Sequence, residues 1–456
     1  MNVSKVSAAA ILSAARKGKP DLAKDLLARM IKEEFGFTLT DITLGADDYS
    51  LNSVNGFMTR DDGEHFFFKF HHEENEESVL QEFYRGEILV EAGFPVDMPI
   101  HICRRVGRQI LLYPLKTVPK LADAARAAEH QSPLPNADEQ TLITAQTALD
   151  KLSAEIYLRT WHPITEADSL NEPVHQLFYH RLTTPGTPPD SLGGRAAVFF
   201  AADRLFHFPD TTVTGAQLRT LHWVINGIRY KKTLEDCFHN ALKYLSPKAL
   251  AQSGGVIAHG DAHNANVWFN PSQPDPDAEE RRHASLSFFD PAFAGKNVPA
   301  LLAEIKATFH NIFAHPNWLY HPSELTETPE IRIDGGVAHM TTGWSLTPLR
   351  RAFLLSKARE LWRPLLHTLA MQNALPARWR ETIRSGLFCC PTLVMDLCAA
   401  SATNPSSRHT PVSSLTGLSI AIMCGTEPEQ PDVVSHFLNA IDPTNPRPEW
   451  DKIHSP

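Results

Sequence analysis

The chain has 456 residues, enough for two packed lobes of unequal size or for two to three domains. Hydrophobic residues make up 43% and charged residues 21%, which is ordinary for a soluble globular protein. The net charge of −9 leaves no basic excess to neutralise phosphates and therefore argues against a nucleic-acid-binding protein. It is compatible with a cationic substrate, although a mildly acidic surface also serves solubility alone.

The spacing of the cysteines and the hydropathy of the chain indicate in which cellular compartment the protein is expected. The six cysteines, at 103, 237, 389, 390, 398 and 424, show neither zinc-site spacing nor a simple disulfide framework, which favours a reduced interior. No run approaches the roughly 20 apolar residues of a membrane span. The N-terminal segment carries Lys24 and Glu33, which do not fit the apolar core of a signal peptide. We therefore expect a cytoplasmic protein without a membrane segment; the sequence leaves its oligomeric state open.

The first 115 residues predict helices followed by a small sheet with one packed helix. Residues 4–35 are amphipathic and interrupted at 18–20, which indicates an N-terminal helical extension over 1–35. A small lobe is expected over 36–115, with a helix over 76–92 that is closed by Gly93 and Pro95. Its strands are expected from β-branched and aromatic residues and from intervening turns, at 37–44, 52–59, 65–71, 100–104 and 109–112.

The rest of the chain, 116–456, has a different character. Residues 116–255 and 299–456 predict mainly helices, broken by proline-rich loops. A short β segment is expected between them, over 256–290. Together the two parts predict an α+β fold with two lobes, a small β-sheet lobe and a large, mainly helical one.

One loop carries most of the chemistry. The buried strand 256–258 leads into His259-Gly260-Asp261-Ala262-His263-Asn264-Ala265-Asn266, and strands 267–269 and 286–289 then form a hairpin that ends at Asp290. The hairpin would bring Asn266 and Asp290 to the same end, beside Asp261. Two carboxylates and a carboxamide are hard oxygen ligands of the kind that suits Mg²⁺. The alternative is a polar turn between strands without chemical function.

The pattern His-Gly-Asp-x-His-x-x-Asn, followed by an aspartate on a strand, resembles the aminoglycoside phosphotransferase and choline kinase family. That family has the protein-kinase-like fold and uses ATP and Mg²⁺. The resemblance implies that Asp261 positions the attacking hydroxyl and accepts its proton, and that Asn266 and Asp290 hold the metal. It also implies that His259 and His263 support the loop.

The resemblance further implies a lysine on a strand that grips the nucleotide phosphates and is oriented by a glutamate on the next helix. Lys69 is the only lysine in the strand 66–70, and a lysine among apolar residues is costly unless it is paired. Glu82 lies eleven residues before Gly93-Phe94-Pro95-Val96, which matches the family pattern, although Glu77 or Glu87 could take its place.

The remaining nucleotide contacts are less defined. The segment 50–55, with Ser53, is the candidate phosphate loop, and it lacks the glycine pattern of protein kinases. The strand 109–115 resembles the one whose main chain contacts adenine, with Leu112 and Tyr113 as candidate neighbours, although Tyr113 could equally be a packing residue. ATP and GTP are not distinguished.

Two features downstream depart from the family or lie outside its motifs. The acid that family members often place after the metal aspartate is absent from 296–306, except for Glu304, which we expect to face solvent or to cap a helix. Histidines at 310, 315 and 321, with Trp318 and Tyr320, are spaced for packing rather than for a metal site, and they could shape the substrate side.

The sequence thus predicts an ATP-dependent kinase that transfers the γ-phosphoryl group to a hydroxyl of a small molecule. His-Gly-Asp in place of His-Arg-Asp, and the lack of an Ala-Pro-Glu segment, do not favour a protein kinase. The alternative is a catalytically silent nucleotide-binding or scaffold protein of the same fold. The sequence does not identify the acceptor, because fold does not determine substrate.

Overall fold

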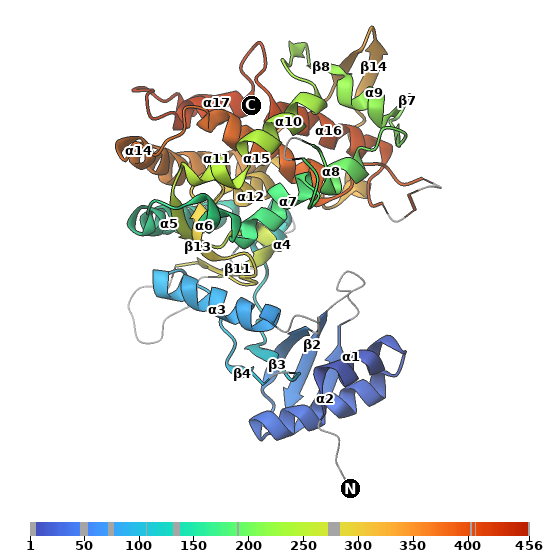
Figure 1. Ribbon diagram of the computed structural model, residues 1–456, viewed down its shortest axis with the longest axis vertical. Helices are drawn as coiled ribbons and strands as arrows, with labels where there is room; N and C mark the ends of the chain where they lie inside the picture. The colour runs from blue at the N-terminus through green and yellow to red at the C-terminus, as the bar shows by residue number, and fades with distance from the viewer. Residues whose placement is uncertain are drawn as a thin grey trace. The chain divides into compact units, whose positions relative to one another are not determined.

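The computed structural model describes residues 6–45, 53–71, 77–105, 107–130, 137–188, 191–271, 283–401, 404–405 and 407–454. The chain forms two compact units (Figure 1). The smaller unit comprises Met1–Glu91, Pro95–Val118 and Ser287–Ala292. The larger unit comprises Ala92–Phe94, Pro119–Leu286 and Phe293–Pro456.

The smaller unit is built on a five-stranded antiparallel sheet in the order β1-β2-β3-β5-β4. Phe66 and Phe68 alternate along the central strand β3 and are fully buried, while Phe67 between them is only half-buried, as the period of two requires. The five strands, and the helix between the third and the fourth of them, confirm the sequence prediction. Their bounds are β1 Leu39–Leu44, β2 Ser53–Arg60, β3 His65–His71, α3 Glu77–Ala92, β4 His101–Cys103 and β5 Ile110–Pro114.

The N-terminal helices α1 (Ala8–Arg16) and α2 (Pro20–Phe35) share a core with this sheet. Leu27 and Ile31 of α2 are fully buried in one cluster with Met58 and Phe68. Arg108 Nη1 also donates to Glu34 Oε1 at 2.6 Å, which ties α2 to the loop before β5. The helices predicted over 1–35 are therefore present, and they belong to the smaller unit, where they pack with its sheet. An amphipathic pattern reveals a buried face but not the partner that covers it.

The larger unit is mainly helical, as predicted. Its α-helices are α4 Leu121–Glu129, α5 Glu139–Thr160, α6 Glu166–Leu170, α7 Tyr179–Leu182, α8 Gly194–Phe199, α9 Gly215–Thr220, α10 Leu234–Tyr244, α11 Pro247–Ala251, α12 Ile305–Thr308, α13 Pro348–Ser356, α14 Arg363–Met371, α15 Trp379–Val394, α16 Pro411–Gly425, α17 Val433–Ile441 and α18 Trp450–His454. Shorter 3₁₀ turns are η1 Pro173–Leu177, η2 Asn264–Asn266 and η4 Pro322–Glu324, and π-helical turns are η3 Phe309–Phe313 and η5 Lys357–Trp362. The α+β class is thereby confirmed.

Two strand pairs flank the motif loop. β10 (Gly255–Ala258) pairs antiparallel with β13 (Gly295–Pro299). The predicted hairpin is present as β11 (Val267–Asn270) and β12 (Ser285–Phe288), and the division between the two units passes through β12. The domain boundary predicted at 115/116 is therefore too simple, because the segment 287–292 returns to the smaller unit.

The larger unit also contains β structure that the sequence analysis missed. A four-stranded sheet has the order β14-β15-β8-β9, with β14 Glu330–Asp334, β15 Val337–Thr341, β8 His222–Ile225 and β9 Ile228–Arg229, and a small hairpin joins β6 Leu205–His207 to β7 Thr212–Thr214. Gly335 and Gly336 (φ 53° and 80°) turn one hairpin, and Asn226 and Gly227 (φ 49° and 80°) turn the other. Such pairs suit tight two-residue hairpin turns.

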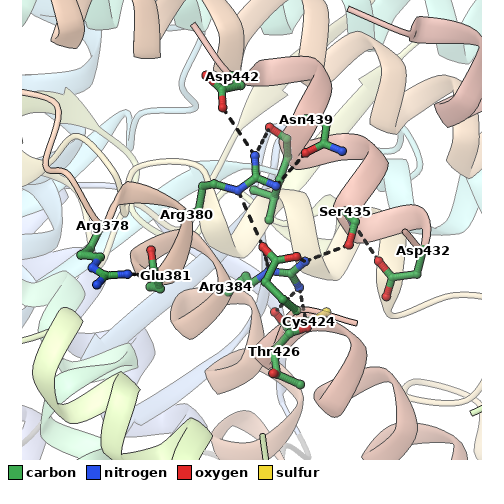
Figure 2. Close-up of polar contacts among 12 residues, drawn as sticks. Arg378, Arg380, Glu381, Arg384, Cys424, Thr426, Asp432, Ser435, Asn439 and Asp442 are labelled. Atoms are coloured by element: carbon green, nitrogen blue, oxygen red, sulfur yellow. Dashed lines mark hydrogen bonds and ion pairs between the residues drawn. The ribbon is translucent and has the colours of Figure 1, made fainter. Parts of the chain in front are cut away.

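The buried side chain of Arg384 links the C-terminal helices α15, α16 and α17 by hydrogen bonds (Figure 2). Arg384 of α15 donates to both carboxylate oxygens of Glu427 at 3.0 Å and to Ser435 Oγ of α17 at 3.1 Å. It also donates to carbonyls at the end of α16, including those of Met423 and Thr426. One guanidinium thus satisfies the helix-end carbonyls of α16 and joins α15, α16 and α17.

All six cysteines are free and buried. Within the described ranges, no helix combines the length and apolar character needed to cross a membrane.

Candidate active site

The motif loop turns sharply at Gly260, between β10 and Asp261. Gly260 has φ +76°, and a Cβ atom there would lie 2.5 Å from the carbonyl oxygen of Phe293. Any other residue would meet both backbone strain and a clash with the main chain. This geometry explains why glycine stands between His259 and Asp261.

The carboxylate of Asp261 is 9% exposed and close to a buried lysine. Lys306 Nζ lies 3.3 Å from its Oδ1, and His263 Nε2 lies 3.9 Å from its Oδ2. Burial by itself raises the pKa of Asp261, but the charge of Lys306, helped by His263 and His259, outweighs it and holds the pKa below the usual range. Oδ1 accepts no well-directed hydrogen bond from the residues that the structure describes. The result is an ionised carboxylate with acceptor capacity to spare.

Lys306 was not identified from the sequence. It is 4% exposed at the start of α12, and its Nζ donates to His310 Nε2 at 3.1 Å. Because an ammonium group has only donors, His310 carries its proton on Nδ1 and donates to the Tyr320 hydroxyl at 2.5 Å. Burial, followed by the nearby Lys306, keeps the pKa of His310 well below its usual value, so that the ring is neutral. A lysine between Ile305 and Ala307 was the available sequence signal.

The loop is held by hydrogen bonds to its own main chain. The Asp261 N–H donates to His259 Nδ1 at 3.3 Å, and Asn266 Nδ2 donates to the Asp261 carbonyl at 3.0 Å. The side chain of Asn266 is thereby oriented, with its Oδ1 turned away from that carbonyl. His263 caps the 3₁₀ turn η2 by accepting from the Ala265 N–H at 3.3 Å. These contacts fit the loop-support role expected for His259 and His263.

A buried ion pair between Arg350 and Glu129 supports the motif loop through Asn311. The Asn264 N–H donates to Asn311 Oδ1 at 2.7 Å, and the Asn311 carbonyl accepts from Arg350 Nη1 at 2.8 Å. The side chain of Arg350 is 0% exposed and makes a two-pronged contact with Glu129 at 2.8 and 2.7 Å. Bidentate pairs of this kind fix orientation as well as charge. The motif loop therefore rests on α4, η3 and α13.

Glu304 corrects one expectation. It is 2% exposed rather than facing solvent, and although it occupies the N-cap position of α12, its side chain makes no capping hydrogen bond. Its Oε2 accepts from Lys357 at 2.7 Å and its Oε1 from the Tyr157 hydroxyl at 2.6 Å. Lys357 also contacts Asp150 at 2.8 Å, so that one lysine lies between two buried carboxylates. The pairing compensates a burial that an isolated charge could not sustain.

The histidines after Asp290 behave mainly as packing residues. His310 and His315 are buried, and burial is the main cause that lowers the pKa of each well below its ordinary value. Trp318 is fully buried and donates to the Phe313 carbonyl at 2.9 Å. Among the described residues, no three His, Cys, Asp or Glu side chains are grouped to hold a metal ion.

The smaller unit holds the other half of the predicted constellation. Lys69 Nζ on β3 lies 3.1 Å from Asp290 Oδ1. Asp290 has φ +55°, a left-handed conformation that Asp tolerates better than most residues. Its segment is attached to the unit by Phe288, whose N–H donates to the Pro95 carbonyl at 2.7 Å and whose carbonyl accepts from Asp97 at 2.9 Å.

The remaining candidates have different standings. Glu82 belongs to α3 and Ser53 begins β2, but their side chains lie outside the described residues, so the pairing of Glu82 with Lys69 stays a prediction. Leu112 is fully buried in β5 and its carbonyl accepts from Ile100, while Tyr113 is half-buried. Residues 50–52 of the predicted phosphate loop are likewise not described, and residues 53–55 form the start of β2.

The structure therefore brings together Asp261 with Asn266 in the larger unit and Lys69 with Asp290 in the smaller one. The convergence of the two pairs stays a prediction. Asn266 Oδ1 and the carboxylates of Asp261 and Asp290 are each hard oxygen donors of the kind that Mg²⁺ favours, so the chemistry of each group fits this ion.

No model of a known protein family matches the sequence, and no curated protein matches it. Among solved structures, a macrolide 2'-phosphotransferase type I is 11% identical with a TM-score of 0.32, covering 80% of this chain and 96% of that one. An aminoglycoside phosphotransferase from Streptomyces rimosus, APH(3'')-Id, is 11% identical with a TM-score of 0.29, covering 89% of this chain and 99% of that one. Both are phosphotransferases, but similarity at this level carries no argument about this chain. Its function has to be argued from its own residues.

Proposed function

We propose that this protein transfers the γ-phosphoryl group of ATP to a hydroxyl of a small molecule. The observation that carries the proposal is the state of Asp261: a buried carboxylate that Lys306 keeps ionised, with Oδ1 still able to accept. A buried ionised group with a specific charge partner is more often found at a functional site than elsewhere. The resemblance of the surrounding motif to the aminoglycoside phosphotransferase and choline kinase family supplies the reaction class.

In this proposal Asp261 orients the acceptor hydroxyl and takes its proton as the oxygen attacks the γ-phosphorus of ATP, while the bond from that phosphorus to the β,γ-bridging oxygen breaks and ADP leaves. Phosphoryl transfer needs little covalent chemistry from the protein, because positioning and charge stabilisation supply most of the acceleration. Asn266 fixes the loop through the Asp261 carbonyl. Lys306 acts through Asp261 as a positioning residue, since its charge keeps the carboxylate ready to accept a proton.

The nucleotide would be held mainly by the smaller unit. Lys69, next to Asp290, is proposed to contact the ATP phosphates, with Glu82 orienting it and Ser53 in the phosphate loop. Main-chain groups near Leu112 and Tyr113 are proposed to contact the base. Asn266 and Asp290 would hold Mg²⁺, which neutralises charge on the phosphates when it is bound. We also propose a cytoplasmic location, because all six cysteines are free.

The test is ATP consumption with Mg²⁺ against a panel of hydroxyl compounds, comparing the wild type with Asp261→Asn. This substitution keeps the shape of the side chain and removes the base. We expect turnover to fall by about a hundredfold or more, as for loss of a general base, while nucleotide binding persists. Asp203→Asn, at an exposed aspartate of the same unit, is the matched control and should leave turnover unchanged.

The outcomes separate the alternatives. Nucleotide binding without turnover on any acceptor favours the catalytically silent protein. Labelling of a protein substrate without turnover of small hydroxyl compounds favours a protein kinase. A complete lack of Mg²⁺-dependent nucleotide binding contradicts all three.

A further inference from the structure

An open cavity of about 690 Å³ lies in the larger unit, and its lining exposes more apolar than polar surface. Its lining includes Arg181 of α7, Arg195 of α8, His180 and Phe293. The carbonyl oxygen of Phe293 packs closely against Gly260, so the cavity adjoins the turn that carries Asp261.

The two arginines converge on the end of α15. Arg181 Nη1 donates to the Leu393 carbonyl at 3.3 Å, and Arg195 Nη1 donates to the same carbonyl at 3.0 Å and to that of Val394 at 3.1 Å. Neither guanidinium has a carboxylate within ion-pair distance in the part of the chain that the structure describes. These contacts occupy one nitrogen of each fork, and an arginine has five donors.

The arginines carry more positive charge than the helix end can balance. The C-terminus of a helix is equivalent to about half a negative charge, whereas two guanidinium groups carry two positive ones. Burial, and then the neighbouring charge of Arg195, lowers the pKa of Arg181 to about 10, and Asp261 acts in the opposite direction. Burial also lowers the pKa of Arg195. Helix capping therefore explains the Nη1 contacts but leaves an excess of positive charge, on a half-buried Arg181 and an exposed Arg195.

We propose that this cavity binds an oxyanion of the phosphoryl acceptor, so that the acceptor is an alcohol carrying a carboxylate or a phosphate group. Guanidinium forks match both oxyanions in shape and charge, and Gln176 and Thr184 in the same lining add polar groups. Anchoring the acceptor there would hold its hydroxyl near Asp261 and exclude cationic acceptors. The inference rests on the proposed phosphotransfer and names its substrate class.

The experiment uses the full-length chain and two matched acceptor series. One series is glycerol, glycerate, glycerol 3-phosphate and 3-amino-1,2-propanediol; the other is glucose, glucuronate, glucose 6-phosphate and glucosamine. Within each series the carbon skeleton is shared, and the members differ in carrying no charged group, a carboxylate, a phosphate ester or an ammonium group. Binding is measured by calorimetry without nucleotide, and ATP consumption is measured with Mg²⁺.

An anionic member is expected to bind about tenfold or more tightly than its neutral and cationic counterparts, which corresponds to one charge-assisted contact. Whether glycerate and glucuronate or the two phosphate esters bind more tightly decides between carboxylate and phosphate. Arg195→Gln should raise the Kd of that anion about ten- to hundredfold while leaving the KM for ATP unchanged. Arg195→Lys should lie between, because it keeps the charge and loses the fork.

Val198→Glu places a carboxylate in the same cavity at a side chain that is 63% exposed, and it should weaken anion binding without removing an arginine. Arg359→Gln removes an exposed charge elsewhere in the larger unit and should change nothing. Equal or weaker binding of the anions than of the other members, lack of binding by every member, or anion binding that survives both Arg195→Gln and Val198→Glu would overturn the inference.

The two proposals fail in different ways. Arginine-dependent anion binding without ATP consumption on any acceptor would leave this site standing and contradict phosphotransfer. ATP-dependent phosphorylation of neutral or cationic acceptors that is insensitive to Arg195→Gln would leave phosphotransfer standing and contradict this site.

Discussion

Replacing Lys306 by methionine tests how Asp261 is kept charged. At 3.3 Å, a pair of unit charges interacts by roughly 5 kcal/mol with an effective dielectric constant of about 20. The variant leaves a buried carboxylate with only the weaker influence of His263 and His259. Loss of one partner of a buried pair costs about 3–5 kcal/mol of unfolding free energy, unless the remaining group becomes neutral instead. We therefore expect lower stability near neutral pH and a protonated Asp261 at higher pH than in the wild type.

The sign of the pH dependence follows from the pKa. In the wild type the pKa of Asp261 is lowered, so its stabilising contribution is present above the unfolded value of 3.8 and is lost as the pH falls below it. In Lys306→Met, burial dominates and raises the pKa of Asp261, so the acid limb of kcat against pH should move to higher pH. Urea unfolding and the pH profile of kcat measure the two effects.

Lys296→Met, at an exposed lysine of β13, is the control and should change neither quantity. Lys306→Arg retains the charge and should keep the acid limb close to that of the wild type, even if its size reduces stability. An unchanged pH profile in a folded Lys306→Met protein would refute the role given to Lys306.

Three further predictions concern the scaffold. Arg384→Met should lower the free energy of unfolding by about 3 kcal/mol in urea titrations, because several buried carbonyls lose their hydrogen-bond donor. Arg378→Gln, which removes an exposed ion pair, should lower it by less than about 1 kcal/mol. Equal losses in the two variants would contradict the account. Burial lowers the pKa of His175 from 6.5 to about 4. The contribution of the neutral ring to the free energy of unfolding is therefore fully present above pH 6.5, and roughly 3 kcal/mol of it is lost as the pH falls to 4. His175→Gln should flatten that part of the stability profile, and an unaltered slope would count against it. Gly260→Ala should lower the free energy of unfolding more than Gly227→Ala in the same urea titration. Both glycines have positive φ (+76° and +80°), but only at Gly260 would a Cβ atom also clash with a carbonyl oxygen. Equal losses in the two variants would contradict the clash.

Local pattern was sufficient for the sheet of the smaller unit. Alternating Phe66 and Phe68, and the turn at 60–63, encode a strand and its hairpin within a few residues. The local sequence pattern was insufficient where a strand pairs with another strand that is distant in the chain. The Gly335-Gly336 and Asn226-Gly227 turns signalled two hairpins, but the parallel pairing of Val337 with His222 that joins them is set by tertiary packing.

The candidate site divides in the same way. Asp261, Asn266 and Gly260 lie in one motif, and the motif could be found because their spacing is local. Lys306 reaches Asp261 only through the packing of α12 against the loop, and Glu304 is buried because Lys357 arrives from a distant helix. Charges that are compensated across the fold look like surface residues in a sequence, which is why Glu304 was misassigned.

The most direct test of the central claim is phosphorus NMR of a reaction containing the protein, ATP, Mg²⁺ and an acceptor that supports turnover in the matched series. The account predicts a new phosphate-ester resonance that grows as the γ-phosphate resonance of ATP declines, and that is absent with Asp261→Asn. Release of inorganic phosphate alone, or an ester that forms equally well with Asp261→Asn, would contradict it.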